Sequence, residues 1–197
     1  MHVTLRLRRG LPSLRHPTLR VPLEKAFATA SRKFGCRLVH YSIQTNHVHL
    51  LAEARDEHPL SRAIKGLCVR LARRLNRAWR RKGRVFGDRF HTRVLRTPLE
   101  VRHALAYCLN NARKHGLVLR GVDPYSSGRW FDGWKDSTHP PPAYTVLARP
   151  MTWLLRTGWK HWDLIPIKKE PSARQTALAI RRAKQRLERK SSCMPKG

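Results

Sequence analysis

The stretch CRLVHYSIQTNHVHLLAE, residues 36–53, contains two strand-like apolar runs that flank the short polar turn 44–46. Side chains alternate between the two faces of a strand, so His47 and His49 project from one face while Val48 and Leu50 project from the other. Two neutral imidazoles on one face can chelate a single metal ion if further ligands are near. The alternative is a pair of surface histidines on a half-exposed strand.

Two elements are predicted before this stretch. Residues 2–8 alternate in polarity as a strand does, and residues 23–34 repeat apolar side chains at helical spacing before Gly35, a helix-ending residue. The turn-rich segment 10–22 separates them. Because the chain begins directly in a strand, we expect that an N-terminal segment is missing from this reading frame.

Three elements are predicted after it. A long helix begins near Pro59, and residues 89–96 are typical of a strand. Thr97-Pro98-Leu99-Glu100 then combines a capping box with proline at the first helical position. This combination predicts a helix that runs to about His115, where Gly116 ends it.

The resulting order is strand, helix, strand, strand, helix, strand, followed by one extra helix. This order is that of an α+β, ferredoxin-like split βαβ fold with an antiparallel sheet. The first and third strands are adjacent in that topology, which places His2, Thr4 and Arg6 beside His47 and His49. We expect these side chains to form a basic, uncovered sheet surface around the candidate metal site.

The composition indicates a polyanionic partner. The chain has 197 residues, enough for one domain and an appendage, and carries 42 Lys and Arg against 12 Asp and Glu, a formal charge of +30. A charge of this size favours nucleic acid over a ribosomal-type role or membrane-surface binding. No apolar run has transmembrane length, so we expect no membrane partner.

The four cysteines are far apart and form no C-x-x-C pair, and three of them fall within apolar patterns. This usage predicts neither a disulfide framework nor a zinc knuckle. It is typical of a reducing, intracellular setting.

The helix that begins near Pro59 has an apolar stripe and a basic remainder. Its basic residues have no acidic residue at i+4, so a phosphate backbone is a better partner for them than an intrahelical ion pair. They are Arg62, Lys65, Arg70, Arg73, Arg74 and Arg77. On the helix that starts at Thr97, Tyr107 and Asn111 stand one turn apart on a polar stripe with His103 and Lys114, distinct from the apolar stripe.

The C-terminal part has a different composition. Residues 119–170 are rich in Trp, Pro and Gly, and we interpret them as a strap packed on the domain, with base stacking by exposed rings as the alternative. Residues 171–197 form a basic tail with a helical pattern at 173–190, either helical or disordered.

Taken together, these segments resemble a known family. The sequence combines Asn46-His47-Val48-His49 and a basic helix with Val85-Phe86-Gly87-Asp88-Arg89-Phe90 and with Tyr107-Cys108-Leu109-Asn110-Asn111. This combination is similar to the single-tyrosine HUH transposases of bacterial insertion sequences, above all to the REP-associated tyrosine transposases. The resemblance covers roughly residues 2–118, and the chain departs from many relatives in having Ala112 where they carry proline.

The resemblance implies that residues 1–118 form a nuclease domain that cuts and rejoins single-stranded DNA beside or within an imperfect hairpin. Tyr107 would attack the phosphorus and stay linked to the 5′ phosphate. His47, His49 and the side-chain oxygen of Asn111 would hold a divalent ion, Mg²⁺ or Mn²⁺, that polarises the phosphate. Arg6, Lys114 and the six basic residues of the helix after Pro59 would contact the DNA.

The implied partner is single-stranded or hairpin DNA, in a bacterial cytoplasmic protein that acts as a monomer or a homodimer. Two other functions remain open at this point. The same fold could bind hairpin DNA or structured RNA without cutting it. The chain could also be a toxin-like or ribosome-associated basic protein whose histidines are incidental, although this leaves the shared stripe of Tyr107 and Asn111 unexplained.

Overall fold

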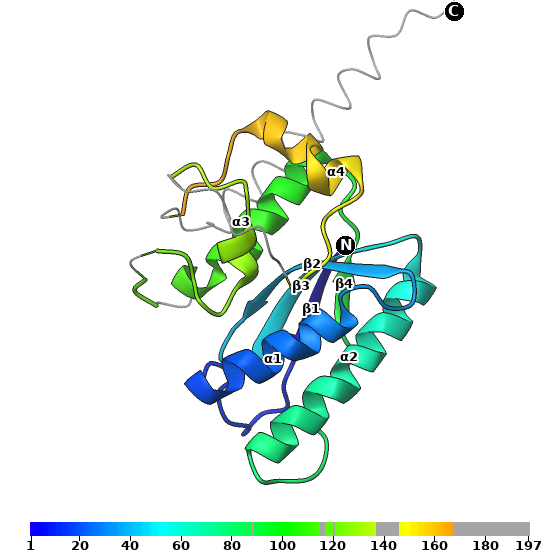
Figure 1. Ribbon diagram of the computed structural model, residues 1–197, viewed down its shortest axis with the longest axis vertical. Helices are drawn as coiled ribbons and strands as arrows, with labels where there is room; N and C mark the ends of the chain where they lie inside the picture. Colours follow the sequence, from blue (N-terminus) through cyan, green and yellow to red (C-terminus); the bar gives the residue numbers. More distant parts are fainter. Residues whose placement is uncertain (88, 115–116, 120, 137–145, 168–197) are drawn as a thin grey trace, which may run out of the picture.

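The centre of the protein is a four-stranded antiparallel sheet in the order β2-β3-β1-β4 (Figure 1). The strands are β1 (His2–Arg6), β2 (Cys36–Ile43), β3 (His47–Ala54) and β4 (His91–Arg93). The computed structural model describes residues 1–87, 89–114, 117–119, 121–136 and 146–167. The element order and the central pairing of β1 with β3 confirm the predicted ferredoxin-like α+β fold.

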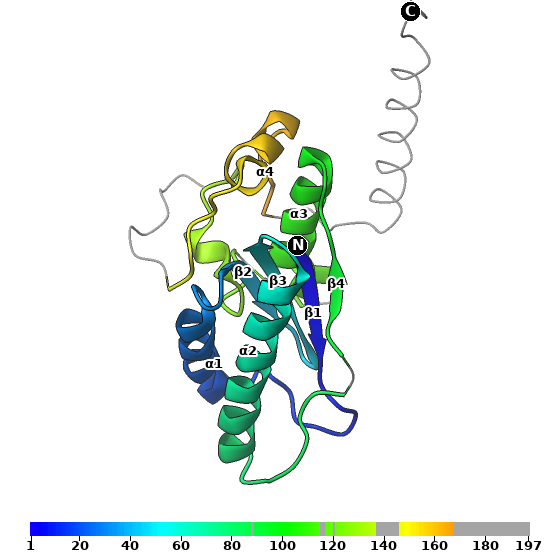
Figure 2. The same ribbon diagram turned by 90° about the vertical axis from the view of Figure 1, so that its right-hand side faces the viewer.

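Two helices cover one face of the sheet. α1 (Pro17–Ala30) and α2 (Glu57–Ala78) lie side by side there (Figures 1 and 2). Val3 and Leu5 of β1, together with Val48 of β3, join the apolar stripes of both helices in the larger core. Burial of each such side chain stabilises the fold by roughly 1.5–3 kcal/mol.

α3 (Pro98–Lys114) covers the other face of the sheet, the face that carries His47 and His49. Leu51, two residues beyond His49 on the same face, packs with the apolar stripe of α3 in a second core. The N-terminus of α3 has the predicted cap. The Glu100 backbone N–H donates to Thr97 Oγ1 at 3.2 Å, and Glu100 Oε2 accepts from the Arg96 backbone N–H at 2.7 Å.

The predicted first helix was wrong at both ends. α1 begins at Pro17 and contains Pro22, which we had placed in the preceding turn region, and it ends at Ala30 rather than at residue 34. Leu19 explains the earlier start, because it is buried on the same face as Leu23 and this burial outweighs the hydrogen bond that Pro22 cannot make. The second helix begins at Glu57, two residues before the predicted Pro59, with Asp56 as its N-cap.

β4 is shorter than predicted. It spans only His91–Arg93 instead of residues 89–96, because only residues 2–4 of β1 pair with it. Further along this edge, Leu7 forms an isolated antiparallel bridge with Phe86.

The expected uncovered sheet face was also wrong. α3 and residues that follow it cover the face, so that His47 and His49 are only 9% and 4% exposed. Phe131, Trp134 and Trp159 are buried against α3 in the second core, whereas Trp153 and Trp162 are exposed. Most of the described aromatic rings between residues 119 and 167 therefore pack rather than face solvent.

Buried polar contacts fix this later segment to β2 and α1. Arg15 forms a two-pronged ion pair with the fully buried Asp123, at 2.8 and 2.9 Å, and also donates to the carbonyl oxygen of Ile43. Glu24 of α1 accepts from Arg129 and from the Tyr41 hydroxyl, both at 2.9 Å. Planar guanidinium groups suit such two-pronged recognition of carboxylates.

Among the described residues, no helix combines the length and the apolar character that a membrane-spanning segment requires. Cys36, Cys68 and Cys108 are free thiols, and Cys193 lies outside the described part of the chain.

Candidate active site

The candidate site lies between β1, β3 and α3. In the antiparallel register, Thr4 pairs with His49 and Arg6 pairs with His47, so the polar faces of the two strands meet as predicted. α3 crosses this surface, and its Cys108 Sγ lies 4.0 Å from the carbonyl oxygen of His49. The contact between Cys108 and β3 places Tyr107, the preceding residue of the helix, next to His49 and His2.

The two histidine rings turn the same nitrogen toward each other. His47 Nε2 lies 3.0 Å from His49 Nε2. On the far side of each ring, His47 Nδ1 lies 2.8 Å from Asn46 Oδ1, and His49 Nδ1 lies 3.2 Å from Thr4 Oγ1 and 3.1 Å from His2 Nε2. The contacts on Nδ1 orient both rings with Nε2 toward the same point, as outer partners do for metal-binding histidines.

Tyr107 stands next to this pair. Its ring centroid is 5.0 Å from that of His49 and 5.8 Å from that of His2, in edge-to-face geometry. No described residue forms a hydrogen bond with its hydroxyl group. Lys114 places its ammonium group 4.9 Å from the centroid of the Tyr107 ring. A cation over an aromatic face is attracted to it, and more strongly when the phenol carries negative charge.

Asn111 is the third predicted ligand, one helical turn beyond Tyr107. Its side chain is fully buried, and neither its Oδ1 nor its Nδ2 has a hydrogen-bond partner among the described residues. An unsatisfied buried amide costs about 1–3 kcal/mol and calls for an explanation such as an ion or a ligand. The donor set of two imidazole nitrogens and one amide oxygen therefore fits a divalent cation, although the described residues contain no cluster of three or more His, Cys, Asp or Glu side chains suited to a metal.

Burial sets the electrostatics of the site. It raises the pKa of Tyr107 above the ordinary value of a phenol, against the lowering effect of the nearby Arg6 charge. Burial also lowers the pKa of His2 to about 4, helped by the positive charges of the N-terminal amine, Arg93 and His91. Near neutral pH, Tyr107 is a neutral phenol and His2 a neutral imidazole.

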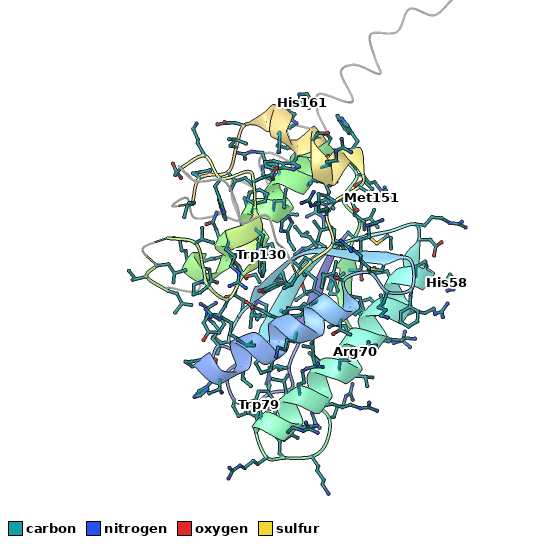
Figure 3. All side chains as sticks on the ribbon, in the orientation of Figure 1. His58, Arg70, Trp79, Trp130, Met151 and His161 are labelled. Carbon is teal, nitrogen blue, oxygen red and sulfur yellow. The ribbon has the colours of Figure 1, made fainter. Side chains whose placement is uncertain are left out.

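The predicted DNA-contacting residues divide between the two faces of the sheet. Arg6 and Lys114 are exposed on the side of the candidate site. The other six lie on α2, on the opposite side; Figure 3 shows Arg70 on that helix, away from α3. Among the described carboxylates, none forms an ion pair with any of these six residues. They are Arg62, Lys65, Arg70, Arg73, Arg74 and Arg77.

Sequence reasoning missed the residues that orient the histidines. It placed His2 and Thr4 on the correct face but gave them no role, and it did not consider Asn46 as a partner of His47. The signal was present in the strand register, because Thr4 lies directly across from His49. Only the side-chain rotamers show which nitrogen each partner contacts.

Comparisons with known proteins agree with the fold and with part of the sequence. Residues 1–96 match the sequence profile of the family described as "Transposase IS200 like". This match includes the sheet and both histidines and ends before α3, so it does not extend to Tyr107 or Asn111. No curated protein sequence matches the chain.

Two solved structures are similar to this chain. A REP-associated tyrosine transposase bound to a REP hairpin superposes with a TM-score of 0.54 at 19% identity, over 77% of this chain and 92% of that one. The second is a protein of Deinococcus radiodurans R1 that is described as a candidate transposase. It superposes with a TM-score of 0.41 at 19% identity, over 48% of this chain and 77% of that one. The first similarity establishes the shared fold. Over residues 1–96, the chain is similar in sequence to the family of IS200-like transposases.

Proposed function

We propose that this protein cuts and rejoins single-stranded DNA through a 5′-phosphotyrosine intermediate, either as a mobile transposase or as a domesticated REP-associated one. The observation that carries the proposal is the position of Tyr107, whose ring lies 5.0 Å from the ring of His49, beside the paired Nε2 atoms. A nucleophile next to two potential metal ligands is suited to metal-assisted phosphoryl transfer to a tyrosine.

Tyr107 is the proposed nucleophile. Its Oη would form a bond to the phosphorus while the bond from phosphorus to the 3′ oxygen breaks, which leaves a 3′ hydroxyl and a 5′ phosphate on the protein. The linkage conserves the energy of the broken bond, so the reverse attack by a 3′ hydroxyl rejoins the strand without ATP. Because the phenol is neutral, its proton must leave during the attack, and the ammonium group of Lys114 would stabilise the developing phenolate.

His47, His49 and Asn111 would hold a divalent cation, Mg²⁺ or Mn²⁺, and the unpartnered buried amide of Asn111 supports this assignment. When bound, the cation would polarise the scissile phosphate. Asn46 and Thr4 keep the two rings oriented through their Nδ1 atoms.

The proposed substrate is hairpin DNA with unpaired nucleotides beside the stem. The formal charge of +30 and the unpaired cations of α2 support a DNA partner, and the similar REP-associated transposase is itself bound to a REP hairpin. In this proposal residues 1–118 contain all the reacting groups. The described residues between 119 and 167 hold α3 in place, and residues 171–197 receive no role.

Trapping the covalent intermediate tests the proposal. Wild-type protein incubated with end-labelled hairpin DNA and Mn²⁺ should form a DNA adduct that survives denaturation. The substrate set must include sequences that flank the gene. Tyr107→Phe, or EDTA added to wild type, should abolish the adduct, while Tyr107→Phe should still bind DNA because the apolar stripe of α3 is unchanged. A wild type that binds these hairpins without forming an adduct would instead be a non-catalytic binder.

A further inference from the structure

A cavity of about 660 Å³ lies between α2 and residues 83–90, apart from the candidate active site. Its apolar lining includes Val69, Phe86 and Phe90, and its basic lining consists of Lys65, Arg84 and Arg89. Val69 is 50% exposed, so this part of the apolar lining is open to solvent. We call this cavity the edge pocket, because it borders the β4 edge of the sheet.

The wall of the edge pocket is held in place by its own hydrogen bonds. Arg84 Nε donates to the carbonyl oxygen of Phe86 at 2.9 Å, and the Arg84 guanidinium also donates to the carbonyl oxygen of Gly87. Asn76 of α2 donates to the carbonyl oxygen of Gly83 at 2.8 Å, which ties the loop to the helix. The pocket is therefore preformed, as small-molecule and base-binding sites usually are.

The charged side chains among the described lining of the edge pocket are all basic. Lys65, Arg84 and Arg89 line it, no described carboxylate does, and none of the three forms an ion pair with a described acidic residue. An apolar, partly aromatic cavity rimmed by cations matches a nucleobase flanked by phosphates. An apolar peptide would leave these cations without partners.

The edge pocket is connected to the candidate active site through β1. The backbone N–H of Gly87 donates to the carbonyl oxygen of Arg6 at 3.1 Å, and Arg6 pairs with His47 across the next strand. Two strand spacings, roughly 10 Å in the plane of the sheet, therefore separate the pocket wall from β3. The pocket lies on the α2 side of the sheet, so a bound strand would pass around the β4 edge to reach the histidine pair. Arg6 itself is exposed between them and can contact a phosphate.

We infer that the edge pocket binds one unpaired nucleobase of the DNA strand that occupies the candidate active site. Phe86 and Phe90 would contact the face of the base, and Lys65, Arg84 and Arg89 the adjacent phosphates. This inference rests on the proposed function, because it takes the ligand from the same DNA substrate. Held in this way, the base would set which phosphate reaches Tyr107.

Photocrosslinking can locate the base. Hairpins are prepared that each carry 5-iodo-2′-deoxyuridine at one unpaired position. Each hairpin is bound to the full-length Tyr107→Phe protein, which cannot cut the strand, and the complex is irradiated. We expect one position to crosslink to a peptide that contains Phe86 or Phe90. Crosslinks only to other peptides, or none from any position of a bound hairpin, would overturn the inference.

Base removal provides the second measurement. Replacing the crosslinking nucleotide by an abasic one should weaken wild-type binding roughly 5- to 150-fold, the range for loss of one stacked base. Phe90→Ala should bind both DNAs with nearly equal affinity, whereas Trp162→Ala, which removes an exposed ring elsewhere, should retain the full difference. Because each protein is compared with itself on two DNAs, a general loss of stability does not imitate this result.

The two hypotheses fail in different ways. A wild type that forms the Tyr107 adduct but is indifferent to base removal excludes the edge pocket as a base site and leaves the proposed function intact. If the affinity of the wild type falls on base removal but no adduct forms, the base pocket is supported and the proposed nuclease function is wrong. If the measured affinity for the hairpin changes with protein concentration but not with base removal, a second copy of the chain occupies the pocket and the inference is wrong.

Discussion

His47 and His49 face each other through their Nε2 atoms at a distance of 3.0 Å. Asn46 Oδ1 can accept only from a protonated Nδ1, so His47 carries a lone pair on Nε2. His49 Nε2 can donate a proton to this lone pair when its Nδ1 accepts from the Thr4 hydroxyl, so one hydrogen bond holds the two Nε2 atoms together. A metal ion bound by the pair would replace this hydrogen bond and would depend on both rings.

Loss of either ring should therefore remove metal binding. His47→Ala and His49→Ala should each lower the affinity for Mn²⁺ at least about a hundredfold, measured by titration calorimetry, since removal even of a residue that orients a ligand costs 10- to 100-fold. The control is His58→Ala, because His58 is exposed on α2. Equal Mn²⁺ affinity in all variants would show that the two histidines do not bind the metal.

Asn111 should show a conflict between stability and metal binding. Asn111→Leu replaces a buried amide that has no described partner with an apolar side chain of similar volume. In EDTA we expect the variant to be more stable than wild type by about 1–3 kcal/mol in urea unfolding. Added Mn²⁺ should stabilise the wild type and leave the variant unchanged. A variant less stable than wild type in EDTA would mean that the amide is satisfied without metal.

The basic face of α2 should contribute affinity and not chemistry, because it lies across the sheet from Tyr107. The double variant Arg73→Gln with Arg77→Gln should weaken hairpin binding and lower the slope of log affinity against log salt by up to about 2. At saturating DNA, its rate of adduct formation should equal that of wild type. Arg149→Gln with Arg156→Gln makes the same charge change at two exposed residues outside α2 and should alter the slope less.

The pH dependence of adduct formation should reflect the phenol of Tyr107. Burial raises its pKa above the ordinary value of about 10, so at pH 7 to 9 only a small fraction is phenolate, and that fraction grows tenfold with each pH unit. With saturating DNA and Mg²⁺, we expect the single-turnover rate to rise throughout this range. A plateau near neutral pH would show that another group accepts the proton before the attack. Lys114→Met should lower the rate across the range, because it removes the positive charge near the ring.

Local patterns in the sequence determined the elements and much of the site. The alternation of residues 47–50 places both histidines on one face regardless of what covers that face, because the pleat of a strand has a period of two. The Thr97–Glu100 capping box fixed the start of α3 for a similar reason, since a cap is made within four residues. The spacing of Tyr107 and Asn111 on one stripe follows from the helical period alone.

The tertiary structure decided what depends on contacts between distant segments. Pro22 predicts a helix boundary by local rules, yet α1 continues through it because Leu19 is buried in a core built from other elements. The approach of Tyr107 to His49 depends on α3 packing over β3, and the placement of the α2 arginines across the sheet depends on which face α2 covers. Periodicity shows that an element has an apolar side but not what that side meets, because the burial that selects the partner is a property of the whole chain.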